Sequence, residues 1–152
     1  MAGEAEKGDT ELAFFEKFAK LADLGVVPGS AQKMLPPAPD ILCRLENGER
    51  VAFELAEACA PEFNAEIARL RHGDVGAVWG DDVSDDTVRK KLRKRYNTEH
   101  PVELLLYRNG ASALPDLQII GKVEGVLGSG LGQFRRVWFL GDALHCIAVA
   151  ES

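Results

Sequence analysis

Cysteine and histidine, the side chains that most often hold zinc, are scarce in this sequence. There are 3 cysteines and 3 histidines among 152 residues, and Cys43, Cys59 and Cys146 are too far apart in the chain to form a CxxC pair. The sequence therefore lacks the motifs of zinc-binding and thioredoxin-like redox proteins. Each cysteine lies among apolar residues, so we expect buried, reduced thiols in a reducing compartment.

The sequence also lacks a long apolar run and an excess of positive charge. No apolar run approaches the roughly 20 residues that span a bilayer, and the polar, acidic N-terminal stretch does not form a secretory signal. With 18 Lys and Arg against 24 Asp and Glu, the net charge is −6. Proteins that bind nucleic acid over a broad surface usually carry a basic face. We therefore expect a cytoplasmic protein without a membrane partner, in which any nucleic-acid contact is local.

What is present is the composition of an ordinary globular domain. The chain is 46% hydrophobic and 28% charged, close to the average for such domains, and a chain of this length can build a core without disulfides or metals. We expect residues 1–9 to form a disordered leader and residues 10–152 to form a single domain. Between Thr10 and Leu24, apolar residues recur at three- and four-residue steps, which predicts an amphipathic helix.

The downstream pattern alternates strand-like and helix-like segments. Asn47-Gly48 separates two apolar runs, Asp40–Leu45 and Arg50–Ala58, and this is the strongest hairpin signal in the chain. The remaining pattern predicts a helix over Ser84–Tyr96, a buried strand over Val102–Tyr107, and two last strands over Arg136–Leu140 and His145–Val149. The segment 117–132 is ambiguous: its pattern predicts a strand start, followed by a glycine-weakened helix or a loop. Such interleaving predicts an α/β fold with a central mixed β-sheet flanked by helices.

Two carboxylates flank the predicted hairpin. Pro39-Asp40 opens its first strand and Glu54 lies in its second, so folding can bring their side chains together. Two carboxylates make a hard-oxygen site that suits Mg²⁺, which keeps several waters. Such a metal activates water against a phosphodiester and stabilises the leaving oxygen. A third carboxylate from the N-terminal helix, Glu16 or Glu11, can complete the metal site, and we expect Glu16.

The neighbours of Glu54 predict a helix packed closely on its face of the strand. Alternate residues of a strand point to opposite faces, and Glu54 shares its face with small side chains, namely Ala52, Ala56 and Ala58. The other face carries Val51, Phe53 and Leu55. A lone acid facing a helix at close range is costly unless it is paired or bound to a metal.

These segments resemble the PD-(D/E)xK nuclease superfamily. The resemblance rests on Pro39-Asp40, the Asn47-Gly48 hairpin and Phe53-Glu54-Leu55-Ala56, and the later segments Thr87–Tyr107 and Phe134–Leu140 are similar to the helix and strands of small members. It implies a restriction-endonuclease-like fold in a single domain. It also implies magnesium-dependent hydrolysis of phosphodiesters at Asp40 and Glu54, with nucleic acid as the partner.

One departure from the family pattern concerns its lysine. The lysine that positions or activates the attacking water should stand two residues after the glutamate, where this chain has Ala56. Lys90, Lys91 or Lys94 on the following helix can substitute for it, and we expect Lys91 to act with Asp40 as a catalytic residue.

The alternative is a catalytically inactive binding or interaction module that acts as a homodimer. The acidic composition and Ala56 favour it. If Arg136, Trp138 and Leu140 share an exposed face, that face suits a dimer contact, because arginine and tryptophan are enriched at interfaces.

The pairing register of the hairpin tests the nuclease hypothesis. A two-residue turn at Asn47-Gly48 would place Asp40 and Glu54 on opposite faces of the sheet. The two acids share a face only if the loop has an odd number of residues, such as three with a bulge. In the register that we expect for such a loop, Leu42 lies opposite Glu54 and Asp40 lies opposite Ala56.

The predicted helix over Ser84–Tyr96 carries a dense run of cations. Six of seven consecutive residues are basic, namely Arg89, Lys90, Lys91, Arg93, Lys94 and Arg95. The run has two interpretations: a solvated helix face balanced by acids upstream, or a surface that contacts phosphates. For the second, we expect the nucleic-acid contacts at Arg89, Lys90, Arg93 and Lys94.

Overall fold

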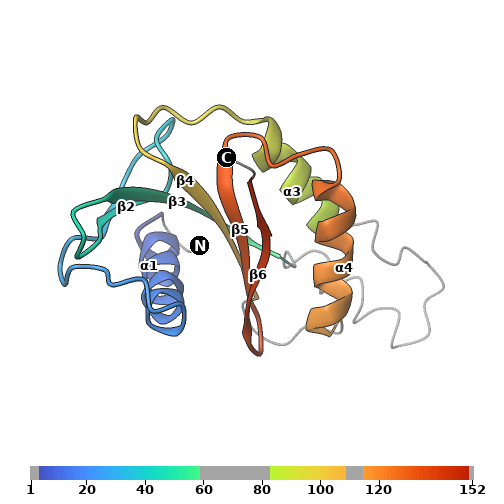
Figure 1. Cartoon of the computed structure of the whole chain (residues 1–152), viewed down its shortest axis with the longest axis horizontal. Coiled ribbons are helices and arrows are strands. Elements are labelled where there is room, and N and C mark those ends of the chain that lie inside the picture. The colour runs from blue at the N-terminus through green and yellow to red at the C-terminus, as the bar shows by residue number, and fades with distance from the viewer. Residues whose placement is uncertain (1–3, 59–82, 109–114, 151–152) are drawn as a thin grey trace.

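The computed structural model describes residues 4–58, 83–108 and 115–150 (Figure 1). Within these ranges the chain forms one sheet and the helices around it. The elements are α1 (Glu4–Leu21), β1 (Gln32–Lys33), β2 (Ile41–Arg44), β3 (Arg50–Glu57), α3 (Val83–Arg93), β4 (Val102–Tyr107), α4 (Asp116–Leu127), β5 (Phe134–Leu140) and β6 (Leu144–Val149). None of the described helices combines the length and the apolar character that a membrane crossing requires.

The strands form a mixed six-stranded sheet in the order β1-β2-β3-β4-β5-β6. The three central strands, β3, β4 and β5, run parallel to one another, and the outer pairs are antiparallel. All six residues of β4 are buried, as its continuous apolar run predicts for a strand covered on both faces. The expected α/β fold with a central mixed sheet is confirmed.

The two faces of the sheet carry different helices. Figure 1 shows α1 on one side of the sheet and α3 and α4 on the other. On the α1 side, aromatic rings form the centre of the core, with ring centroids 5.1 Å apart for Phe15 and Phe53 and 5.1 Å apart for Phe18 and Trp138. On the other side, Ala52, Ala56 and Ala58 of the β3 segment pack in the core that includes α3 and α4. The predicted division of β3 into an alanine face and a large-residue face is therefore confirmed.

The helices differ from expectation at two places. Helix α1 begins at Glu4, inside the stretch where we expected a leader. The prediction of a strand at the start of 117–132 is wrong, because α4 runs unbroken from Asp116 to Leu127. Its buried residues, Ile119, Val123, Val126 and Leu127, follow helical spacing, and burying this stripe outweighs the cost of its two glycines, about 1 kcal/mol each.

A bulge between β4 and β5 places two consecutive arginines opposite one carboxylate. Val102 pairs with Phe134 and Leu104 pairs with Val137, so one residue of β4, Glu103, faces two residues of β5, Arg135 and Arg136. A bulge of this kind turns neighbouring side chains away from strict alternation.

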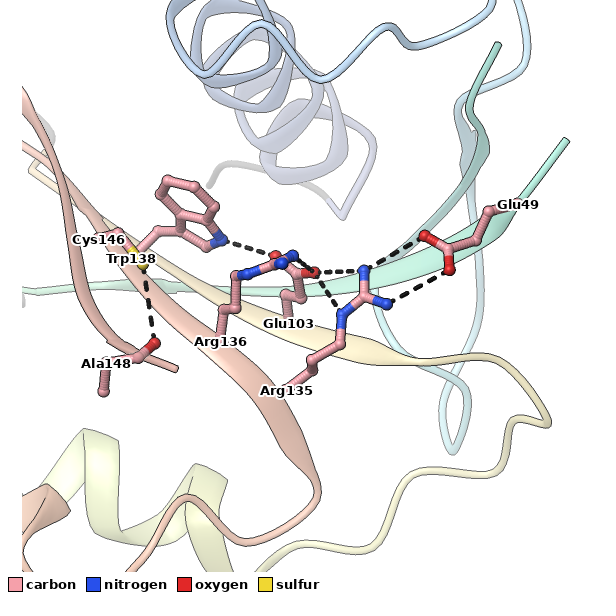
Figure 2. A network of polar contacts seen from close by, with 7 residues as sticks. All are labelled: Glu49, Glu103, Arg135, Arg136, Trp138, Cys146 and Ala148. Atoms are coloured by element: carbon pink, nitrogen blue, oxygen red, sulfur yellow. Dashed lines mark hydrogen bonds and ion pairs between the residues drawn. The ribbon is translucent and has the colours of Figure 1, made fainter. Parts of the chain in front are cut away.

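Figure 2 shows the resulting network around the buried Glu103 carboxylate, which is 1% exposed. Its Oε2 accepts hydrogen bonds from Arg135 Nε at 2.9 Å, Arg135 NH2 at 2.7 Å and Arg136 NH1 at 3.0 Å. Its Oε1 accepts the indole N–H of Trp138 at 2.7 Å. The proposed exposed face of Arg136, Trp138 and Leu140 does not form, because Trp138 turns into this network and Leu140 is buried.

The cysteines agree with expectation only in part. Cys43 on β2 is buried, and burial raises the pKa of its thiol to about 11. Cys146 lies on β6, an edge strand of the sheet, and it is exposed. The prediction of a buried thiol is therefore wrong for Cys146. Cys59 lies outside the described residues.

Candidate active site

A three-residue loop closes the hairpin that carries the two acids. The backbone N–H of Leu45 donates to the carbonyl of Glu49 at 2.8 Å, which leaves residues 46–48 in the loop. Gly48 has a φ of +91°, a conformation that favours glycine. The side chain of Asn47 accepts the N–H of Glu49 at 2.9 Å. The loop therefore has the odd count that puts Asp40 and Glu54 on one face.

The observed register places the two acids directly opposite each other. Leu42 pairs with Ala52, so two residues earlier on the β2 side Asp40 faces Glu54. The expected register, with Leu42 opposite Glu54, is wrong by two residues, because the loop precedes Glu49 instead of including it. The shared face that the nuclease hypothesis requires is nevertheless present.

Hydrogen bonds join Asp40, Glu54 and Lys91 into one cluster. The backbone N–H of Asp40 donates to Glu54 Oε1 at 3.0 Å, and the N–H of Leu55 donates to Asp40 Oδ2 at 2.9 Å. From α3, Lys91 Nζ donates to Glu54 Oε2 at 2.6 Å. The Glu54 side chain is 3% exposed, against 24% for Lys91 and 24% for Asp40. We call these three side chains the acid–lysine cluster.

Opposing electrostatic effects within the cluster act on the pKa of Glu54. Burial is the main cause that raises the pKa of Glu54, and the neighbouring charge of Asp40 raises it further. The charge and the hydrogen bond of Lys91 act in the opposite direction, and the pKa of Glu54 stays above its ordinary value. A buried carboxylate next to a second carboxylate is stabilised by a cation, and here Lys91 supplies part of that charge.

Tyr96 places a polar group beside the cluster. Its side chain is buried, and among the described residues no acceptor meets the hydroxyl at full hydrogen-bond geometry, although the Glu54 carboxylate lies close enough to interact with it. Burial and the nearby charge of Glu54 raise the pKa of Tyr96 far above its usual range, so the hydroxyl is neutral and can donate a proton to a hydrogen bond. Buried hydroxyls usually have a partner, and an oxygen of a water or a ligand would satisfy this one.

The loop before β5 holds the end of α3 in place. The side chain of Gln133 accepts the N–H of Tyr96 at 2.9 Å and donates to its carbonyl at 3.1 Å. Gly132 has a φ of +59°, and a Cβ there would lie 2.6 Å from the carbonyl oxygen of Leu92. Only glycine fits this close approach to the residue next to Lys91. Sequence patterns gave no signal for Tyr96, Gln133 or Gly132.

The third carboxylate that we expected is not at the cluster. Glu16 is exposed on α1, and no group of three His, Cys, Asp or Glu side chains in the described ranges lies close enough to hold a metal ion. Glu11 is the buried acid of α1, and it reaches the site through Lys33, whose Nζ is 2.7 Å from Glu11 Oε1 and 3.9 Å from Asp40 Oδ1. Phe15 and Phe18 take the face of α1 that packs on the sheet, which turns Glu16 outward.

Asp40 and Glu54 still have the chemistry that a magnesium site needs. Mg²⁺ is commonly bound by one or two carboxylates together with waters and substrate phosphate oxygens. Asp40 is the more accessible acid, and its Oδ1 lies 3.9 Å from Lys33 Nζ. The oxygen donors at this position are therefore two carboxylates rather than three.

A hollow of about 290 Å³ adjoins the cluster. Leu42 and Ala52, the next residues on the face of Asp40 and Glu54, line it together with Met34, Ala38, Pro39, Asn97, Thr98, Glu99 and His100. None of the three side chains of the acid–lysine cluster lines the hollow, which lies next to the cluster along the same sheet face.

The predicted nucleic-acid contacts lie on the outer surface of α3 and just after it. Arg89, Lys90, Arg93 and Lys94 are exposed, whereas Lys91 is half-buried against the sheet. Lys94 Nζ lies 5.4 Å from the centroid of the Tyr96 ring. The structure thus separates the one lysine that pairs with Glu54 from the cations that face solvent.

Comparison of the chain with protein-family models, with curated proteins and with solved structures gave no match.

Proposed function

We propose that this protein is a magnesium-dependent phosphodiester hydrolase with a restriction-endonuclease-like fold and a nucleic-acid substrate. The observation that carries the proposal is the acid–lysine cluster. Two strands hold Asp40 and Glu54 opposite each other, and α3 brings Lys91 to 2.6 Å from Glu54. This arrangement supplies from a helix the lysine that the family pattern expects at Ala56.

Each member of the cluster has a distinct task in this proposal. Asp40 and Glu54 would hold Mg²⁺, which would supply an activated water and stabilise charge on the phosphate. Lys91, held 2.6 Å from Glu54, stabilises the negative charge that develops as the water oxygen attacks phosphorus. The attacking water releases a proton to solvent as its oxygen bonds to phosphorus, the P–O bond to the leaving oxygen breaks, and that oxygen takes up a proton from solvent. Tyr96, whose hydroxyl lies beside Glu54, donates a hydrogen bond to a non-bridging phosphate oxygen.

Metal binding and cleavage test the proposal separately. We expect Mg²⁺ or Mn²⁺ to raise the melting temperature of the unaltered protein but not of Asp40→Ala. We expect a panel of single- and double-stranded DNA and RNA to include a cleaved substrate, with cleavage lost in Glu54→Ala and Lys91→Met. Lys20→Met, which removes an exposed lysine of α1, is the matched control and keeps full activity. A protein that shows neither the metal shift nor cleavage would contradict the proposal.

The second candidate is the inactive interaction module, and one observation favours it. Both oxygens of Glu54 already accept hydrogen bonds from the protein, and its side chain is 3% exposed. In that case Lys91 replaces the metal as the charge that stabilises the carboxylates. This alternative predicts no metal response and a homodimer in light scattering.

A further inference from the structure

Two arginines face each other next to the loop of the β2–β3 hairpin. Arg44 pairs with Arg50, and both side chains are exposed. Like charges directly opposite in a sheet destabilise it. Neither guanidinium forms an ion pair within the described ranges, although Arg108, Arg135 and Arg136 each pair with a carboxylate there. An anion from outside the described chain would remove the repulsion between the two arginines.

The surroundings of this arginine pair also suit an anion. Arg44 and Arg50 line a hollow of about 210 Å³ whose other lining residues are uncharged, namely Ser30, Gln32, Leu42 and Cys43. The Ser30 hydroxyl accepts the N–H of Arg44 at 3.1 Å and lies 3.2 Å from its carbonyl oxygen, which fixes this hydroxyl beside the pair. Gln32 adds an exposed amide from β1. Among the described residues, no carboxylate lines the hollow.

The arginine pair shares a sheet face with the acid–lysine cluster. Asp40 and Arg44 are four residues apart along one side of the hairpin, and Arg50 and Glu54 are four apart along the other, so alternation puts all four on one face. At about 3.4 Å per residue, the two pairs are roughly 14 Å apart. Leu42 lines both this hollow and the one beside the cluster, so the two hollows adjoin.

We propose that Arg44 and Arg50 form a phosphate-binding subsite that holds the backbone of a nucleic-acid strand a few nucleotides from the phosphodiester at the acid–lysine cluster. This inference rests on the proposed function. A polyanion is repelled by Asp40 and Glu54, and by a protein with a net charge of −6. Two opposed guanidiniums counter this repulsion locally, and each can donate two parallel hydrogen bonds to a phosphate.

The test measures binding without catalysis. A fluorescein-labelled single-stranded 12-mer of deoxythymidine is titrated with protein in EDTA at low salt, and binding is followed by anisotropy. We expect Arg44→Gln/Arg50→Gln to weaken binding roughly tenfold to a hundredfold, since each arginine loses a charge-assisted hydrogen bond. The slope of log affinity against log salt concentration falls by about 0.7 for each phosphate that an arginine no longer neutralises. Arg44→Lys/Arg50→Lys keeps the charge and loses less affinity.

A charge-matched variant separates a site from general electrostatics. Lys17→Gln/Lys20→Gln removes two exposed lysines of α1, on the other side of the sheet, and we expect less than a twofold change. Equal affinity of the arginine variants and the unaltered protein would overturn the subsite. An equal loss in the lysine control, or no binding by the unaltered protein, would also overturn it. Circular dichroism checks folding, and the lysine-for-arginine variant decides the question if the glutamine variant unfolds.

The two proposals fail in different ways. If binding depends on the arginines but the protein cleaves nothing with Mg²⁺ or Mn²⁺, the subsite proposal stands and the hydrolase proposal is refuted. Cleavage that depends on Glu54 and Lys91, with binding indifferent to Arg44 and Arg50, removes the subsite alone.

Discussion

Replacing Asp40 by asparagine removes one of two negative charges that the hairpin holds directly opposite each other. The amide oxygen of asparagine can still accept the N–H of Leu55, which Asp40 Oδ2 accepts at 2.9 Å. The backbone N–H of residue 40 still donates to Glu54. The substitution therefore changes the charge of the acid–lysine cluster while it preserves the hydrogen bonds that shape it.

We expect Asp40→Asn to leave the protein as stable as before or to stabilise it by up to about 1 kcal/mol at pH 7, the upper range for like charges paired across strands. The 24% exposure of the Asp40 side chain limits the gain through solvent screening. Most substitutions destabilise by about 1 kcal/mol, so the expected sign is unusual. Urea unfolding without divalent metal measures it, and the melting temperature should rise by about 2–4 °C at most.

The pH dependence gives an independent check. The pKa of Glu54 is raised above its ordinary 4.5 in the folded protein, first by burial and then by Asp40. At pH values between 4.5 and the pKa of Glu54 in the folded protein, the folded state binds more protons than the unfolded state. The contribution of Glu54 to stability is therefore complete below pH 4.5 and is lost as pH rises through the folded pKa. Asp40→Asn removes one cause of the shift, so this loss should shrink.

Glu16→Gln is the matched control, because it removes one exposed negative charge on α1. We expect its free energy of unfolding to change by less than about 0.5 kcal/mol, with an unchanged pH profile. If Asp40→Asn instead destabilised the protein by more than 1 kcal/mol and kept the pH profile, repulsion between the two carboxylates would not be a feature of the metal-free protein.

Three further predictions concern the scaffold. Gly132→Ala should destabilise the protein by about 1–3 kcal/mol in urea unfolding, because its Cβ would meet the α3 backbone at 2.6 Å. Gly121→Ala, in open space on α4, should instead stabilise the protein by about 0.5–1 kcal/mol. Equal effects of the two substitutions would contradict the close approach at Gly132. Glu103→Gln should cost about 2 kcal/mol, since three arginine hydrogen bonds lose their charged acceptor, and a change below 0.5 kcal/mol would show that solvent replaces them. Thiol labelling at pH 8 should modify exposed Cys146 and spare buried Cys43, whose pKa is about 11, and labelling of Cys43 at the same rate would contradict its burial.

The parts of the fold that short-range patterns encode were predictable from the sequence. The alternation of alanines and large residues along β3 assigned both faces of that strand, and Asn47-Gly48 located the hairpin. The register was missed by two residues because the residues that close the loop, Leu45 and Glu49, give no distinctive signal. An odd number of residues in the loop was enough to predict that Asp40 and Glu54 lie on one face of the sheet.

The rest depends on contacts between distant segments. The sequence offered Lys90, Lys91 and Lys94 as substitutes, and the expectation of Lys91 gained a physical basis only from the packing of α3, which places Lys91 against Glu54. Glu103 is one acid inside an apolar run, and its role depends on a bulge in β5, about 30 residues further along the chain. Neither side-chain periodicity nor turn signals report such pairings.

A lysine carried by a helix has a consequence that a lysine on the strand would not have. The two acids belong to the sheet, but the cation reaches them only while the last turn of α3 stays docked. Local opening of a helix requires less free energy than global unfolding. Detachment of α3 would therefore remove Lys91 from the two acids and inactivate the site while the β-sheet remains intact. A partner that captures the detached helix would then act as an inhibitor without touching either carboxylate.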